Sequence, residues 1–306
     1  MCRLGPVTLV AKDRFQAEHG EAIQSLARGD KLDRSFVAEW RLYTRRYDHF
    51  LTVNIERHEN EMAWSAAYEA AEYVLNLIRM RFGYYHTRNI KRGGGYVQEQ
   101  FSSRIVVNKG GDIGFTSQGG PWGSHLDDEW MTHLDDALGD FAGLLSDLGS
   151  WLASGDDPAS PILERLRYAN GLMSEAYSEP HDHIRLVRLI AALEAMALLP
   201  REEKAENLAR RCSIVGNWDD SELEKDIFAA VKEAYRLRNA VVHGDAPTAT
   251  AVMEAFLGLE RHLLAIYLGF LHFHASIHNT CRPQSIKHLR RLASNHIRNW
   301  ASAGYQ

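Results

Sequence analysis

The sequence predicts a mainly helical protein in which a smaller α+β domain precedes a helical bundle. Short apolar runs that alternate with polar residues are confined to the first half of the chain. In the second half, apolar residues recur at a spacing of three and four almost throughout, as in amphipathic helices. The polar segment 154–161, with two prolines, is typical of a linker. We therefore expect domains over 1–155 and 156–278 and a basic helical tail over 279–306.

The first half mixes strands and helices. Strands are expected where Val, Ile, Leu and Phe alternate with Thr and Asn, and helices where Ala, Glu, Leu and Met dominate. The hairpin is expected around the turn sequence Asn-Lys-Gly-Gly-Asp. In chain order, the first half gives a strand at 7–11, a helix at 13–28, a strand at 50–55, a helix at 59–82, a hairpin of 104–107 with 113–116, and a helix at 127–153.

The second half contains no run with strand periodicity. Its apolar residues fit helical stripes separated by short polar turns, which is typical of a bundle. These stripes predict helices at 161–178, 181–199, 202–214, 221–243, 248–274 and 284–300.

Composition and charge exclude several classes of protein. The chain has 306 residues and a net charge of −5, which argues against a uniformly basic nucleic-acid coat. Its three cysteines are far apart, so neither a disulfide scaffold nor a cysteine zinc site is supported. The N-terminus does not resemble a signal peptide, and no apolar run approaches the ~20 residues that span a bilayer. We expect a cytoplasmic protein without membrane attachment, metal or cofactor.

One segment, 233–245, carries most of the functional signal. Arg238 lies close in angle to the apolar stripe of its predicted helix, where an unpaired charge is costly. Asn239 and His243 are four residues apart and share a neighbouring face, and Gly244 follows as a C-cap. The alternative is structural, because cations near a helix C-terminus complement the helix dipole.

A second charge is also embedded in an apolar face. Glu194 lies in a predicted helix that is apolar nearly all round. Because two buried charges of opposite sign favour pairing, one hypothesis is that Glu194, or a partner bundle, orients Arg238. The alternative is that Glu194 caps a loop or pairs with Arg210 or Arg211.

The run Arg238-Asn239-Ala-Val-Val-His243 resembles the Arg-x4-to-6-His signature of the HEPN superfamily. The wider segment 160–275 resembles the ApeA-like HEPN family through 189–194, 207–211 and 234–244. The resemblance implies a bundle of four or five helices that forms a homodimer. It also implies a metal-independent endoribonuclease of toxin–antitoxin or other antiviral defence systems. It further implies an antitoxin or defence-system partner. Other relatives are non-catalytic proteins that bind RNA or regulate a partner, and this alternative stays open.

The proposed residues suit RNA cleavage without metal. Such cleavage needs a base for the 2′-hydroxyl, an acid for the leaving 5′-oxygen and a cation for the phosphorane. Two copies of His243 in a two-fold dimer supply base and acid, and the unperturbed pKa of histidine, ~6.5, suits both roles. Arg238 holds the phosphate and Asn239 orients it or the imidazole. Tyr235 either contacts RNA or packs in the core.

Two further regions are candidates for binding RNA. Residues 73–98 lack acidic side chains and interleave basic residues with aromatic ones, which suits base stacking. The tail is basic and is set against an acidic body. The alternatives are a solvated helix end for the first region and docking of the tail on the acidic stretch 127–140. The basic candidates are Arg79, Arg81, Arg88, Lys91, Arg92, Lys287, Arg290 and Arg291.

Overall fold

The computed structural model is mainly helical, as the sequence predicts. It describes residues 2–26, 28, 34–35, 37–38, 41, 48–55, 60–87, 90, 102–107, 113–118, 126–127, 129–154, 161–199, 201–217 and 220–280. Strands in this part of the chain are confined to a small N-terminal sheet and one hairpin. None of the helices described is long and apolar enough to cross a membrane.

The N-terminal sheet has three antiparallel strands in the order β1-β2-β3. Its strands are β1 (Cys2–Leu4), β2 (Val7–Ala11) and β3 (His49–Val53), and helix α1 (Lys12–Leu26) follows β2. Strand β2 has the predicted bounds, and β3 differs from the predicted strand by one or two residues at each end. Strand β1 was not predicted, because three residues are too few to display alternation.

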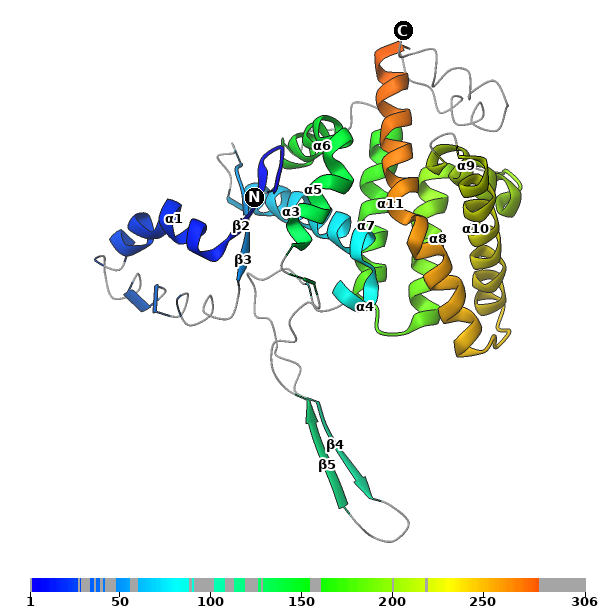
Figure 1. Ribbon diagram of the computed structural model, residues 1–306, viewed down its shortest axis with the longest axis horizontal. Helices are drawn as coiled ribbons and strands as arrows, with labels where there is room; N and C mark the ends of the chain where they lie inside the picture. The colour runs from blue at the N-terminus through cyan, green and yellow to red at the C-terminus, as the bar shows by residue number, and fades with distance from the viewer. Residues whose placement is uncertain are drawn as a thin grey trace.

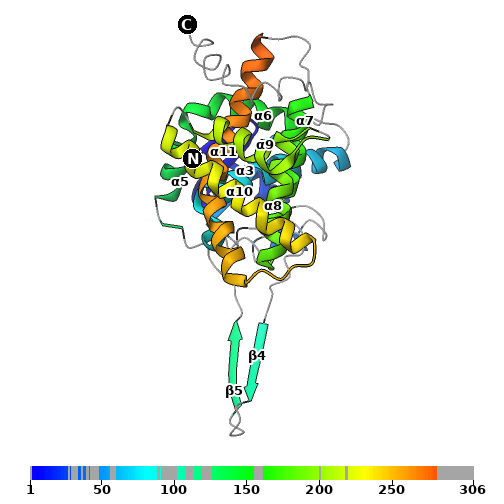
Figure 2. The same cartoon turned by 90° about the vertical axis from the view of Figure 1, so that its right-hand side faces the viewer.

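The predicted hairpin consists of β4 (Ser102–Val107) and β5 (Ile113–Gln118), paired antiparallel with Val107 opposite Ile113. It projects away from the helical body in both ribbon views (Figures 1 and 2).

The helices around this region differ from the prediction in two ways: the short helix α4 was not predicted, and one predicted helix is broken. They are α3 (Asn60–Phe82), α4 (Tyr84–Thr87), α5 (Trp130–Leu138), the 3₁₀ turn η1 (Gly139–Phe141) and α6 (Ala142–Ser154). The predicted single helix at 127–153 is therefore two helices, divided at Gly139 where the chain tightens into a 3₁₀ turn.

The second half is the predicted helical bundle. Its helices are α7 (Pro161–Ser178), α8 (Asp182–Ala197), α9 (Lys204–Gly216), α10 (Ser221–Val242) and α11 (Ala249–Thr280). The predicted bounds hold to within two residues, except that α11 continues to Thr280. Helix α8 packs against α7, α9, α10 and α11, which surround it in Figure 1. The helix predicted at 284–300 lies outside the described residues.

One hydrophobic core spans both halves of the chain. It includes Tyr73 on α3, Leu145 on α6, Leu189 on α8 and Phe256 on α11, each of which is 0% exposed. Helix α3 contacts α6, α7 and α11. The predicted boundary near residue 155 falls in a segment outside the described residues, and buried side chains on both sides of it belong to the same core.

Candidate functional site

Helix α10 carries the motif, and its sequence specifies both of its ends. The carboxylate of Asp220 caps the first turn by accepting hydrogen bonds from the backbone N–H groups of Glu222 and Leu223, at 2.9 and 3.1 Å. The apolar stripe, which includes Ile227 and Val231, is buried against the bundle. The helix is therefore fixed in rotation, and the faces of its last two turns are set by the core.

The C-terminal end of α10 is closed by a Schellman motif. The N–H of Asp245 donates to the carbonyl of Ala240 at 2.9 Å, and that of Gly244 donates to Val241 at 3.2 Å. Gly244 has φ +87°, a conformation that glycine adopts at little cost. His243 is the C-cap residue, and its side chain is exposed to solvent.

Arg238 is held by two acceptors. One terminal nitrogen donates to Asn239 Oδ1 at 2.9 Å, and the other lies 3.4 Å from Glu194 Oε2 on α8. The Arg238 and Glu194 side chains are 19% and 17% exposed, so solvent screens the pair only in part. The predicted pairing of Glu194 with Arg238 is confirmed. The alternative partners pair elsewhere, Arg210 with Glu206 and Arg211 with Glu202.

Tyr235, which precedes Arg238 by one helical turn on α10, packs against this cluster. It is only 6% exposed, and its ring centroid lies 5.7 Å from the guanidinium carbon of Arg238. Burial, and then the negative charge of Glu194, raise the pKa of the Tyr235 hydroxyl. Of the two readings of Tyr235, the structure supports core packing. Lys204 adds a second cation, with Nζ 3.9 Å from Glu194 Oε1.

His243 lies one helical turn beyond this cluster. Its backbone N–H donates to the carbonyl of Asn239 at 2.9 Å, which continues the helical ladder. The structure thus brings Arg238, Asn239, Glu194 and Tyr235 together. It presents His243 separately, at the exposed end of the same helix.

The predicted RNA-binding residues have different fates. Arg79 was expected on a basic surface, but this prediction is wrong: its side chain is 4% exposed. It donates to Glu72, to Asn76 at 2.9 Å and to the carbonyl of Ile90 at 2.9 Å. Residues 73–98 contain no acidic side chain, but Glu72 lies seven residues, or about two turns, before Arg79 on the same buried side of α3. Arg81 is exposed, with its guanidinium carbon 5.5 Å from the ring centroid of Phe82.

The remaining RNA-binding candidates lie outside the described residues. They are Arg88, Lys91, Arg92, Lys287, Arg290 and Arg291.

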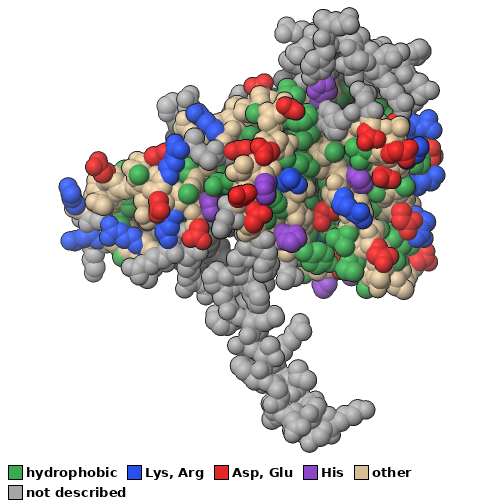
Figure 3. All heavy atoms as spheres, in the orientation of Figure 1, with side chains coloured by type: hydrophobic (Ala, Val, Ile, Leu, Met, Phe, Trp, Pro, Cys, Tyr) green, Lys and Arg blue, Asp and Glu red, His purple; other side chains and the backbone are tan. Residues whose placement is uncertain are grey.

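Charges of both signs are interspersed over α9 and α10 on the face shown in Figure 3. Ion pairs such as Lys232 with Glu206 and Arg236 with Glu233 account for part of this pattern. The cation of Arg238 therefore lies near a surface of mixed charge.

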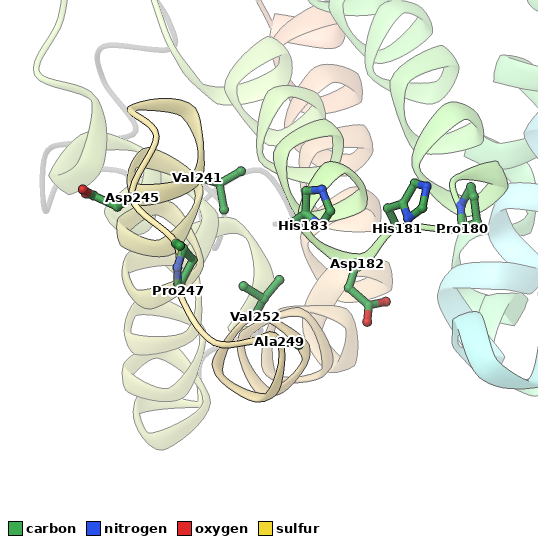
Figure 4. A pocket seen from close by; sticks show the side chains of 10 residues that line it. Pro180, His181, Asp182, His183, Val241, Asp245, Pro247, Ala249 and Val252 are labelled. Carbon is green, nitrogen blue, oxygen red and sulfur yellow. The ribbon is translucent and has the colours of Figure 1, made fainter. Parts of the chain in front are cut away.

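A pocket of about 520 Å³ adjoins the end of the motif helix (Figure 4). The start of α8, the end of α10 with the loop after it, and the start of α11 form its walls. Sequence reasoning missed His181 and His183, which line it. The available signal was a pair of histidines flanking Asp182 directly after Pro180, at a helix start. The lining residues are Pro180, His181, Asp182, His183, Val241, Asp245, Ala246, Pro247, Ala249 and Val252.

Comparison of the chain with protein-family models, with curated proteins and with solved structures gives no match. Within the described ranges, no three His, Cys, Asp or Glu side chains are grouped so that they would hold a metal ion. The site is therefore interpreted from its own geometry.

Proposed function

We propose that this chain is a member of the HEPN superfamily and an endoribonuclease that cleaves RNA without a metal ion. The observation that carries the proposal is the arrangement at the end of α10. Arg238 is oriented by Glu194 and Asn239, its side chain is 19% exposed, and the exposed His243 follows one turn later. Phosphate-ester cleavage requires an oriented cation and an accessible acid–base group, which the dimer proposed below would bring to one phosphate.

Each residue has a distinct role in the proposed reaction. Arg238 binds the scissile phosphate and stabilises the charge of the phosphorane. One His243 takes the proton of the 2′-hydroxyl as the 2′-oxygen bonds to phosphorus. A second His243 gives a proton to the 5′-oxygen as the P–O5′ bond breaks. The products are a 2′,3′-cyclic phosphate and a 5′-hydroxyl.

The proposed site is shared by two copies of the chain, because one motif supplies one histidine and the reaction uses two. A two-fold axis beside the motif helices brings two His243 and two Arg238 together. Val242, next to His243, is 52% exposed, and a partner chain would cover this apolar side chain. The setting that we propose is antiviral defence in the cytoplasm, with regulation by an antitoxin or another defence-system partner.

A non-catalytic role is the second candidate. Both terminal nitrogens of Arg238 already have acceptors within the chain, so the residue also serves to join α10 to α8. In this reading the bundle binds RNA, or a partner, without cutting it.

One experiment separates the two candidates. The purified full chain is incubated with an end-labelled single-stranded RNA in EDTA, and the product ends are analysed. We expect a 2′,3′-cyclic phosphate and a 5′-hydroxyl, and no cleavage of the DNA of the same sequence, which lacks the 2′-hydroxyl. RNA binding without cleavage supports the non-catalytic candidate. Cleavage that needs Mg²⁺, or leaves 5′-phosphates, excludes the proposed mechanism.

A further inference from the structure

The pocket between α8, α10 and α11 adjoins the proposed site on the motif helix itself. Val241, which lines the pocket, is three residues beyond Arg238 and so lies on the same side of α10, about 5 Å along its axis. Asp245 and Pro247, in the loop after His243, line the pocket from the other side of the helix end. The guanidinium of Arg238 itself points the other way, to Glu194, which lies eleven residues or about 16 Å beyond His183 along α8. A chain bound at Arg238 therefore reaches the pocket by continuing past His243 at the end of α10.

The walls of the pocket combine apolar surface with two aromatic rings. Val241, Val252 and His183 face a common space in Figure 4. The imidazole rings of His181 and His183 are 5.8 Å apart between centroids and inclined by 31°. The pocket is open to solvent, since His181 and His183 are both exposed, and its volume of about 520 Å³ is enough for a flat heterocycle. Imidazole rings stack on such a heterocycle and also exchange hydrogen bonds with its edge.

The acidic side chains of the pocket do not favour a phosphate as its occupant. Asp182 accepts a hydrogen bond from the buried guanidinium of Arg185 at 2.6 Å, which neutralises much of its charge. Asp245 also lines the pocket, but its carboxylate points away from the other labelled side chains in Figure 4. The environment is thus near neutral and partly apolar, which suits a base better than an anion.

We propose that this pocket binds one unstacked nucleobase of the single-stranded RNA that is held at Arg238 and His243. The inference rests on the proposed function, since it assigns the pocket to the same RNA. Bases of single-stranded RNA turn out of the stack and insert between aromatic side chains, whereas paired bases stay inside the duplex. The pocket accordingly selects single strands over duplexes.

The test measures binding separately from cleavage. The probe is a single-stranded pentanucleotide of mixed sequence with 2′-O-methyl riboses, which lack the nucleophile and are not cleaved. We expect the probe to shift the imidazole NMR signals of His181 and His183. The double variant His181→Ala with His183→Ala should raise its Kd by roughly 10-fold or more, the scale of one lost stacking contact. His19→Ala, an exposed histidine on α1, is the matched control and should leave Kd unchanged.

A second variant fills the pocket without removing a polar group. Ala249→Trp, at the exposed first position of α11, should weaken binding similarly, whereas Ala17→Trp on α1 should not. The unmodified protein should bind the duplex form of the probe more weakly than the single strand. The Ala249→Trp variant should bind the two forms with equal affinity.

The outcomes distinguish this inference from the proposed function. If the unmodified protein cleaves RNA through His243, yet both pocket variants bind the probe normally, the pocket assignment is overturned and the nuclease proposal stands. If nothing is cleaved but the probe occupies the pocket, the nuclease proposal fails and the base pocket stands. Equal affinity for single strand and duplex also overturns the base pocket.

Discussion

The guanidinium of Arg238 lies 3.4 Å from the carboxylate of Glu194, which precedes it by 44 residues in the chain. This contact joins the last turns of α10 to the centre of the bundle through α8. It fixes the one cation of the motif in direction while leaving part of it exposed. The relationship gives the proposed site its rigidity, and it can be tested by substitution.

Glu194→Gln removes the negative charge and keeps the shape. We expect the free energy of unfolding to fall by about 1 kcal/mol, because a partly buried guanidinium loses its counter-charge. RNA cleavage should also slow, since Arg238 is less well oriented. Chemical denaturation and the cleavage assay measure the two effects. Glu175→Gln is the control, because its pair with Arg188 is far more exposed and should contribute little.

Arg238→Lys tests the geometry of the cation. Lysine keeps the charge but lacks the planar fork that contacts two acceptors at once. We expect cleavage nearly as low as in Arg238→Ala. Recovery of full activity by lysine would show that charge alone matters at this position.

His243→Ala separates chemistry from stability. Because the side chain is exposed at the helix end, the free energy of unfolding should change by less than ~0.5 kcal/mol. Cleavage should fall roughly 10²–10⁴-fold, the range for a general acid–base group. The rate in EDTA is compared with that of His19→Ala. Equal cleavage by the His243→Ala protein would place the active site elsewhere.

Gly244→Ala tests the turn that presents His243. No atom would lie within 4 Å of the added Cβ, so the cost is only that of the left-handed backbone at φ +87°. We expect a loss of about 1 kcal/mol. Gly258→Ala in the interior of α11 also meets no atom within 4 Å and should instead stabilise by about 0.5–1 kcal/mol. Losses of the same size in both variants would mean that the φ of Gly244 is not the cause.

Arg79→Ala and Arg81→Ala separate a buried cation from an exposed one, two residues apart on α3. Arg79→Ala removes the guanidinium that pairs with Glu72 and leaves that buried carboxylate without its counter-charge. We expect the free energy of unfolding to fall by about 3–5 kcal/mol. Arg81→Ala should change stability by less than ~0.5 kcal/mol, and it is the one expected to affect RNA binding. Thermal unfolding and RNA titrations check both expectations.

Glu260 predicts how stability depends on pH. Its carboxylate accepts the Tyr84 N–H at 2.6 Å, and burial raises its pKa from 4.5 to about 7, although Arg185 and Tyr177 oppose the shift. Between about pH 4.5 and 7, Glu260 is therefore protonated in the folded state and ionised in the unfolded state. The stabilising contribution is complete below pH 4.5 and disappears as the pH rises through 7.

Glu260→Gln should flatten this dependence, because the amide still accepts the Tyr84 hydrogen bond and does not ionise. Between pH 5 and pH 8, the unmodified protein should lose on the order of 1–3 kcal/mol more of its free energy of unfolding than the variant loses. Urea denaturation at the two pH values gives the comparison. An identical pH dependence in both proteins would assign it to other groups.

The local pattern of the sequence was sufficient for the five helices described between residues 161 and 280 and for the helix end at Gly244. These features depend on apolar periodicity and on turn chemistry within a few residues. Periodicity also placed Arg238 and Glu194 on apolar faces. The cost of burying a single unpaired charge made their pairing one of two hypotheses, and the structure decided between them. The same reasoning failed for Arg79, because α3 is packed into the core and buries polar residues of its sequence as well as apolar ones.

Only the tertiary structure decided which charges meet and where the surface is hollow. Glu72 and Arg79 are seven residues apart, yet their burial depends on α3 packing against α7 and α11. The pocket forms where His181, Val241 and Ala249 converge from three helices. No local pattern encodes that meeting, because the positions of helix ends are set by how the whole core packs.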